Sequence, residues 1–162
     1  MAIVKSVMKT NLITATPDET VEVVASRMKE HNLGAILLVE GGKLVGIFTE
    51  RDALNRIAAA GRDPKGMPVR EVATANPVVA KESMHVKECA QILRDRGFRH
   101  LPVVNDQGKN VGIISSRDFF MYMTDELEQV IDRSREKGQV IEQDLDIFEL
   151  VGGGGYGIPR SK

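Results

Sequence analysis

Residues 46–52 read Gly-Ile-Phe-Thr-Glu-Arg-Asp, and residues 112–118 read Gly-Ile-Ile-Ser-Ser-Arg-Asp. The likeness extends back toward the N-terminus with a constant shift of 65 residues, which becomes 66 after one inserted residue near Gly108. Thirteen positions are identical in this alignment, whereas ordinary amino-acid usage gives only about three by chance over such a span. The sequence therefore contains an internal duplication of one structural unit.

The length and composition are those of an ordinary globular protein. A chain of 162 residues is typical of one compact domain. Each repeat, at roughly 60 residues, could bury only about 60% of its unfolded surface, so we expect the two halves to share a core. The net charge is -1 and aromatic residues make up 4% of the chain. This composition argues against a nucleic-acid partner, because the chain has no excess of positive charge to bind phosphates and few aromatic side chains to stack on bases.

Neither a membrane span nor an oxidising compartment is indicated. No apolar run approaches the about 20 residues that a helix needs to cross a bilayer, and residues 1–6 lack the apolar segment of a signal peptide. The single cysteine, Cys89, cannot form an internal disulfide, and its apolar neighbours at helical spacing predict a small buried side chain. We therefore expect a cytoplasmic protein that does not contact a membrane.

The first repeat reads as a strand, a helix, two strands and a second helix. Residues 16–19 have the hydroxyl, proline and acid of a capping box, which predicts a helix start, and apolar residues then recur every three or four positions up to Asn32. The second helix is predicted to begin at Thr49. The predicted strands are 12–15, 35–39 and 44–48, with a hairpin turn at 40–43.

The second repeat follows the same order after a linker at 61–68 that is rich in Gly and Pro. Its predicted elements are strands at 77–80, 101–104 and 110–114, a helix at 84–96 ended by Gly97, and a last helix from Arg117 to about residue 137. This last helix keeps one side apolar, but the first repeat has no counterpart for the part beyond about Leu127. Core packing and contact with a second copy of the chain are both open interpretations of that side.

These elements predict an α/β (α+β) protein built from tandem duplicated β-α-β-β-α repeats. The first repeat with its linker spans residues 1–66 and the second spans 67–126. Residues 127–162 are predicted to form a helical extension and a flexible Gly-rich tail. Three glycines within 152–157 match the spacing of a dinucleotide-binding fingerprint, but no helix follows to receive a pyrophosphate, so we interpret this stretch as tail.

The repeated segments also carry the candidate site. In each, a hydroxyl residue and an aspartate three positions later have the spacing of a capping box, and helix capping alone is one explanation for them. An arginine in the same first turn, Arg51 or Arg117, is not explained by capping, because it complements the helix dipole less well than an acid. The hydroxyl and aspartate pairs are Thr49 with Asp52 and Ser115 with Asp118.

The chemistry of these groups favours a nucleotide over a bare phosphate. Hydroxyls and backbone N-H groups at a strand-to-helix junction can bind phosphate. A carboxylate would repel phosphate but can accept two hydrogen bonds from the vicinal hydroxyls of ribose, and apolar strand ends suit a flat base. The residues therefore predict a nucleoside phosphate site.

The sequence resembles a tandem pair of CBS domains, the cystathionine-beta-synthase-type repeats that together form a Bateman module. The family pattern of glycine, apolar residues, Ser or Thr, two variable residues and Asp is met at 46–52 and 112–118, and a second hallmark is Arg99-His100 before a Leu-Pro-Val-Val strand. The resemblance covers residues 3–124 and is closest to stand-alone CBS-pair proteins of the bacterial type. It implies repeats packed about a pseudo-twofold axis, with two clefts that in many members bind AMP, ADP, ATP or S-adenosylmethionine.

The resemblance also implies roles for individual residues. Asp52 and Asp118 would hold ribose hydroxyls, with Thr49 and Ser115 near ribose or phosphate. Arg99 and His100 would face phosphates, joined by Arg51 or Arg117, while Ile13, Ala35 and Val78 would line base pockets. Because Gly34-Ala35 stands in the first repeat where the second has Arg99-His100, we predict that the Asp118 cleft is the stronger phosphate site, unless phosphates of both clefts share these two residues near the axis.

The leading hypothesis is a regulatory, non-enzymatic sensor of adenine nucleotides that reports occupancy through its dimer geometry or to a regulated protein. No nucleophile and base pair can be assembled from the sequence, and His31 and His85 lack partners at metal-ligand spacing, so we predict neither catalysis nor a metal. The alternative is an interaction or dimerisation module whose clefts are empty or hold S-adenosylmethionine or NAD. The family commonly forms homodimers, and the resemblance implies one here.

Overall fold

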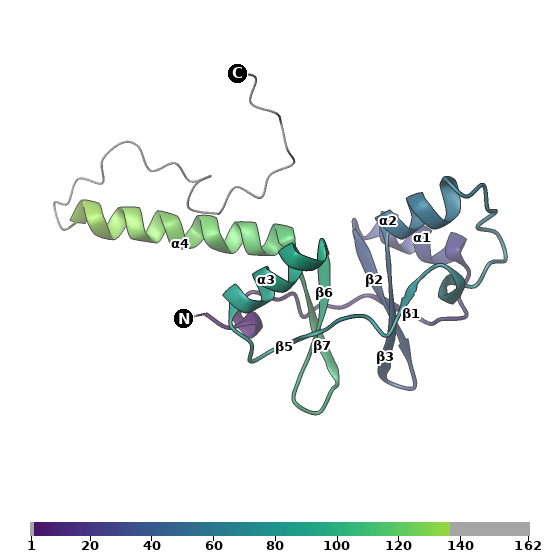
Figure 1. The fold of residues 1–162 in the computed structure, drawn as a ribbon, viewed down its shortest axis with the longest axis horizontal. Coiled ribbons are helices and arrows are strands. Elements are labelled where there is room, and N and C mark those ends of the chain that lie inside the picture. Colours follow the sequence, from purple (N-terminus) through teal and green to yellow (C-terminus); the bar gives the residue numbers. More distant parts are fainter. Residues whose placement is uncertain (1, 137–162) are drawn as a thin grey trace, which may run out of the picture. The chain divides into compact units, whose positions relative to one another are not determined.

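The computed structural model describes residues 2–136 of the chain. The chain divides after Tyr122 into two units, and all features below except the later turns of the last helix belong to the first unit. That unit contains two sheets, one for each half of the duplication (Figure 1). In each sheet a short strand lies parallel to the first strand of an antiparallel hairpin, with a helix connecting them.

The first sheet has the strand order β1-β2-β3-β4. Its last strand comes from the beginning of the second half and pairs antiparallel with β3. The elements of this half are β1 (Thr14–Ala15), α1 (Val21–Glu30), β2 (Ala35–Glu40), β3 (Lys43–Thr49), α2 (Glu50–Asp52), π-helical turns (Ala53–Ala58) and, after the linker, β4 (Thr74–Ala75).

The second sheet has the order β5-β6-β7. Lys9, from the N-terminal end of the chain, makes a single antiparallel bridge to Ile113 in β7 and so takes the place that β4 has in the first sheet. The elements of this half are β5 (Ala80–Lys81), α3 (Val86–Arg96), β6 (His100–Val104), β7 (Asn110–Ser115) and α4 (Ser116–Glu136).

The β-α-β-β-α order predicted for both repeats is confirmed, and the hairpin strands lie within about two residues of their predicted bounds. Gly97 ends α3 in the left-handed conformation, with φ of 64°, which glycine adopts without steric cost. The predicted strand at 77–80 is wrong in position. Extended pairing instead occurs at β4 and β5, and Asn76 between them has a φ of 45° that interrupts a continuous strand.

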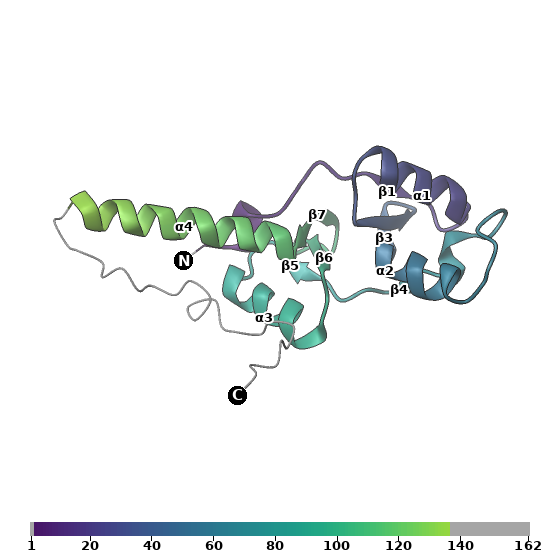
Figure 2. The same ribbon diagram turned by 90° about the horizontal axis from the view of Figure 1, so that it is seen from above.

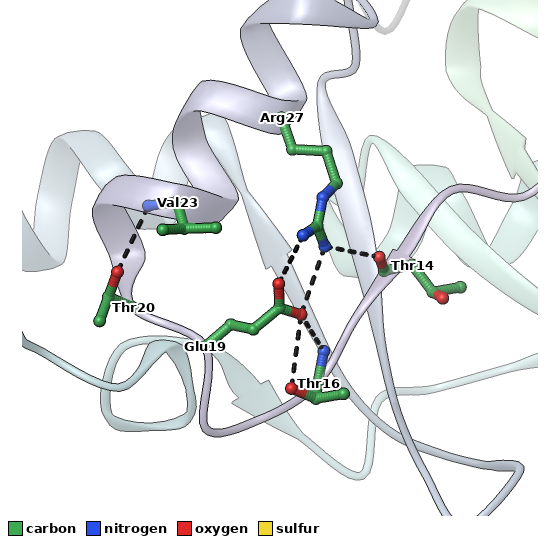
Figure 3. Close-up of polar contacts among 6 residues, drawn as sticks. All are labelled: Thr14, Thr16, Glu19, Thr20, Val23 and Arg27. Atoms are coloured by element: carbon green, nitrogen blue, oxygen red, sulfur yellow. Dashed lines mark hydrogen bonds and ion pairs between the residues drawn. The ribbon is translucent and has the colours of Figure 1, made fainter.

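Helix α1 begins one turn later than its capping box predicts. The backbone N-H of Thr16 donates to Glu19 Oε2 at 2.6 Å, as the capping box requires, but Thr20 is the residue that caps the helix (Figure 3). The reason is a tertiary contact: Val69 N-H donates to the carbonyl of Glu19, and Val21 N-H donates to the carbonyl of Met67. These bonds hold residues 19–21 beside the linker and delay the first helical turn.

The two halves exchange short segments. A 3-10 turn at Val4–Ser6 lies on the second half, where Val4 N-H donates to the carbonyl of Met84 at 2.8 Å (Figure 1). A matching turn at Val69–Glu71 lies on the first half. Val4 and Val69 are equivalent positions of the duplication, and both are fully buried. Each half is therefore completed by a segment that precedes the other half in sequence.

The core consists of three clusters rather than the single shared core that we expected. One lies in the first half and includes Val69 and Val72 from the exchanged segment, and another lies in the second half and includes Val4. A smaller cluster of Ala35, Leu37 and Ile47 receives Ile113 from the second sheet. The exchanged segments and the packing of Ile113 on this cluster both join the halves.

Cys89 is fully buried in the second core, as predicted, and burial raises the pKa of its thiol to about 11. Helix α4 is continuous from Ser116 to Glu136 (Figure 2). The Gly-rich stretch and the rest of residues 137–162 lie outside the described residues. Within residues 2–136, no helix is long and apolar enough to cross a membrane.

Candidate functional site

Both repeated segments form capping boxes at the end of a hairpin. In the first, the backbone N-H and the hydroxyl of Thr49 donate to Asp52 Oδ2 at 3.0 and 2.7 Å, and Asp52 N-H donates back to the hydroxyl at 3.2 Å. In the second, Ser115 and Asp118 make the same three bonds at 2.9, 2.6 and 3.2 Å. One oxygen of each carboxylate is therefore fixed by the turn that it caps.

The other oxygen of each carboxylate meets a cation, and the two cations come from different places. Asp52 Oδ1 lies 3.3 Å from Nε of Arg56, four residues later in the same helical segment. Asp118 Oδ1 lies 3.0 Å from Nζ of Lys9, which comes from the N-terminal end of the chain. Both carboxylates are largely covered, with 13% and 12% of the side chain exposed, so these pairings are partly shielded from water.

A cavity of about 300 Å³ lies between the two halves beside the first segment. The first half supplies Thr49, Arg51 and Asp52 from the end of β3 and from α2. The second half supplies Arg99 and His100 at the start of β6. The remaining wall is made by Gly34, Ile47, Glu50, Thr74, Asn76, Pro77, Val78, Phe98 and Pro102.

The cavity brings together six of the eleven predicted site residues, namely Thr49, Arg51, Asp52, Val78, Arg99 and His100. The other five do not line it. Ile13 packs against the first core and Ala35 is buried in the cluster between the sheets. Ser115, Arg117 and Asp118 lie at the equivalent turn of the second half.

Arg99 and His100, which we predicted to lie beside Asp118, line the cavity beside Asp52, while the charge of Asp118 also acts on His100. His100 lies opposite Ser115 in the β6-β7 ladder, as its sequence position implies. Its ring nevertheless lies against Gly34 of the first half, where an added Cβ would be 3.0 Å from His100 Cε1. The absence of a side chain at Gly34 therefore lets His100 extend to the cavity that Asp52 lines.

A family model described as CBS domain matches residues 4–59 and 69–125. The chain belongs to the CBS domain family. It is 40% identical over 118 residues to CBS domain-containing protein YhcV of Bacillus subtilis, a match that spans 73% of this chain and 83% of YhcV. The solved structure of CBS domain protein NE2398 superimposes with a TM-score of 0.71 at 28% identity, covering 76% of this chain and 98% of that one.

Two further solved CBS proteins hold adenosine compounds. The CBS domain protein PAE2072 from Pyrobaculum aerophilum was determined with AMP, and its TM-score is 0.67 at 26% identity over 72% of this chain and 89% of that one. The CBS domain pair of protein MJ0100 was determined with 5'-methylthioadenosine and S-adenosylmethionine, with a TM-score of 0.70 at 27% identity over 78% and 98% of the two chains.

The CBS cavity is lined by two acidic side chains, Glu50 and Asp52, and by two basic ones, Arg51 and Arg99. Arg51 Nη1 donates to the carbonyl of Gly97 at 3.1 Å, which places a guanidinium across the boundary between the two CBS repeats. Burial lowers the pKa of His100 below its ordinary value, and the charges of Asp118 and Glu50 oppose this effect. His100 is therefore neutral at pH 7, so that its ring offers one donor and one acceptor to whatever fills the cavity.

Several residues of this CBS cavity were not predicted from the sequence, chiefly Thr74, Asn76 and Phe98. Asn76 does carry a sequence signal, because Asn11 occupies the equivalent position of the first repeat. Phe98 carries none, since an isolated aromatic residue after a helix stop is common in surface turns. Among residues 2–136, no group of three or more His, Cys, Asp and Glu side chains is placed to hold a metal ion.

Proposed function

We propose that this CBS pair binds an adenine nucleotide, AMP, ADP or ATP, in the cavity lined by Asp52, Arg99 and His100. The observation that carries the proposal is the meeting, in one cavity, of an anchored carboxylate from one repeat with an arginine and a neutral histidine from the other. The complexes of PAE2072 with AMP and of MJ0100 with S-adenosylmethionine support an adenosine ligand for this fold.

The roles follow from the chemistry of each group. Asp52 Oδ1 pairs with Arg56 of the same helical segment, which is not among the residues that line the cavity, so this oxygen can accept from a ribose hydroxyl while keeping its cation. Val78, Ile47 and Pro77 give an apolar wall for the base. Arg51 and Arg99 supply guanidinium groups for phosphate, which they bind in a planar, two-pronged geometry.

The size of the cavity favours a small nucleotide. At about 300 Å³ it lies at the lower end of the range for small-molecule sites. A dinucleotide such as NAD would extend well beyond it, so AMP is the first ligand to test. Occupancy would be reported to a partner because both repeats form the walls, and a ligand that contacts both must favour one relative arrangement of the repeats over others. The proposed role is regulatory and requires no catalytic group.

Calorimetric titration of the chain with AMP, ADP, ATP and S-adenosylmethionine tests the proposal. Asp52→Asn keeps a capping group but loses the charge, and we expect AMP to bind about 10- to 100-fold more weakly, as for the loss of a hydrogen bond to a charged group. Asp106→Asn, in an exposed turn of the second half, is the matched control and should bind like the parent chain.

Arg99→Gln tests whether Arg99 recognises the phosphate rather than the ribose of the nucleotide. The substitution should weaken binding of AMP while leaving the affinity for adenosine unchanged, because only AMP carries the phosphate. No heat and no thermal shift with any of the four compounds would rule out the proposal. Equal weakening of AMP and adenosine would remove Arg99 from the phosphate site.

A second candidate function, assembly as a homodimer, is favoured by the exposed apolar side chains of α4. Phe120, Met121 and Val130 expose 57%, 54% and 49% of their surface. Phe120 and Met121 are neighbours in the chain, and adjoining exposed apolar side chains can form part of an interface. Light scattering distinguishes the two functions, since Met121→Glu should lower the molecular mass in solution without changing the affinity for AMP.

A further inference from the structure

Lys9 stands at the second half-site, which we define by Ser115 and Asp118. Its ammonium lies 3.0 Å from Asp118 Oδ1, the carboxylate oxygen that the capping box leaves open. The Lys9 backbone is fixed by two hydrogen bonds with Ile113: its N-H donates at 2.9 Å and its carbonyl accepts at 3.0 Å. The root of this side chain is therefore anchored beside the half-site, although 66% of the side chain is exposed.

The first half has no such cation in the corresponding place. The shift of 65 residues that aligns the repeats places Lys9 on Thr74, which lines the cavity. Asp52 is neutralised by Arg56 instead, and Arg56 also donates to the backbone carbonyls of Val72 and Ala73 at 2.9 and 2.8 Å. The cation of Asp52 thus comes from its own helical segment. The cation of Asp118 comes from a segment whose equivalent in the first half, at Thr74, lines the cavity.

We infer that Lys9 is a built-in occupant of the second half-site, so that the chain binds one nucleotide at Asp52 and none at Asp118. This inference rests on the proposed function, because it takes the ribose role of Asp52 as its reference. A diol at Asp118 would meet the Lys9 ammonium, which reaches Asp118 Oδ1 from the position equivalent to the cavity-lining Thr74, whereas Arg56 of the first half is not among the residues that line the cavity. If displaced, the ammonium would lose its partner at a carboxylate that is only 12% exposed.

The charge state of Asp118 agrees with a formed ion pair. Burial raises the pKa of its carboxyl, but hydrogen bonds from Ser115 and Lys9 outweigh burial and hold the pKa below the ordinary value. The carboxylate is consequently ionised and paired at neutral pH. Position 122, which corresponds to Arg56 in the first half, is Tyr122, so the ion pair that Arg56 makes within its own helical segment is not repeated from this position in the second half.

Calorimetry of the full chain with AMP tests the inference through the number of sites. The parent chain should bind one AMP per chain, and Lys9→Thr, which gives position 9 the residue found at 74, should bind two. Lys5→Thr is the matched control, because it removes the same charge from the same segment but breaks an ion pair with Glu82 instead. It should bind one AMP, as the parent chain does.

Adding a second substitution to Lys9→Thr shows which aspartate forms each AMP site. In the Lys9→Thr background, Asp118→Asn should return the chain to one site and Asp52→Asn should leave only the new one. If Lys9→Thr proves unstable in thermal unfolding, Lys9→Met keeps the aliphatic stem and removes only the ammonium.

The outcomes separate the inference from the proposed function. One site in both the parent and Lys9→Thr, or two in both, overturns the inference and leaves the proposed function intact. A third outcome is that the parent chain binds no AMP, whereas Lys9→Thr binds one AMP at a site that depends on Asp118. That result would support the role of Lys9 and overturn the assignment of the nucleotide site to Asp52. No AMP binding by either chain overturns both.

Discussion

Gly112 lies where β7 passes within contact of the N-terminal segment. A Cβ added there would lie 2.6 Å from Met8 Sδ and 3.0 Å from the backbone carbonyl of Lys9. At the equivalent Gly46 the nearest atoms are further away, at 3.1 Å for Leu38 Cδ1 and 3.3 Å for the carbonyl of Thr74. An added side chain would therefore press on neighbouring protein atoms at both glycines, and more severely at Gly112 than at Gly46.

Gly112→Ala should lower the free energy of unfolding by about 1–3 kcal/mol, as is usual for an added group in a filled space. The methionine side chain can move aside, but the carbonyl of Lys9 is held by Ile113. Gly46→Ala, the matched substitution in the other repeat, should cost less. Urea denaturation followed by circular dichroism measures both, and an equal cost at the two positions would contradict the contact described here.

At the scale of single elements, Glu19 and Arg27 fasten α1 to β1 (Figure 3). Arg27 bonds the Glu19 carboxylate and also donates to the carbonyl of Thr14 at 2.9 Å. The hydrogen bond from Arg27 is the largest influence on Glu19 and lowers the pKa of its carboxyl below the ordinary value of 4.5, against a smaller opposing effect of burial. The strand and the helix are thus joined by a charged bridge.

This bridge predicts a dependence of stability on pH. Because the pKa of Glu19 is lower in the folded chain than in the unfolded one, the unfolded chain binds the proton more readily. The stabilisation is complete above about pH 4.5 and is lost as the pH falls through the folded pKa. Glu19→Gln should lower the free energy of unfolding by about 1 kcal/mol at pH 7, since both side chains are about one quarter exposed.

The comparison is made by urea denaturation at pH 7 and at pH 3. The difference between parent and Glu19→Gln should shrink at pH 3, because the stabilisation is lost as the pH falls towards the lowered folded pKa of Glu19. Glu22→Gln, in the first turn of α1, is a suitable control. A difference that stays constant with pH would mean that the Glu19 charge does not contribute to stability.

Local patterns predicted the elements well but could not predict contacts between halves. The hairpins and the end of α3 follow from apolar runs and from Gly97, which are signals within a few residues. The start of α1 could not be predicted because it depends on hydrogen bonds from Val21 and Val69. The same limit explains why the contact of the His100 ring with Gly34 of the other half was not predicted, since an added Cβ at residue 34 would lie 3.0 Å from that ring.

For the molecule as a whole, the exchanged segments make each half depend on the other. The first core includes Val69 and Val72, which follow the linker, and the second includes Val4, which precedes the first half. The duplication shows in the sequence that Val4 and Val69 are equivalent. The duplication does not show that each valine packs on the opposite half. Packing on its own half and packing on the other half would give the same apolar pattern in the sequence.

Two fragments test this dependence. Residues 2–62 contain β1, β2, β3 and α1 but lack Val69, Val72 and β4, whereas residues 2–75 contain both valines and β4. Only the longer fragment should show a cooperative thermal transition by circular dichroism, because the shorter one leaves part of its core exposed to water. Cooperative unfolding of the shorter fragment would show that the exchanged segment is dispensable.

The exchange also sets an order of events during synthesis on the ribosome. The first core can close as soon as the residues around Val72 have emerged. Val4, although made before the strands and helix of the first half, must wait until β5 to β7 and α3, whose core it joins, have been translated. Domains generally fold as they emerge from the N-terminus. Here the segment around Val4 is made before the first half but buried after it, so its apolar side chains stay exposed until the second half has been made.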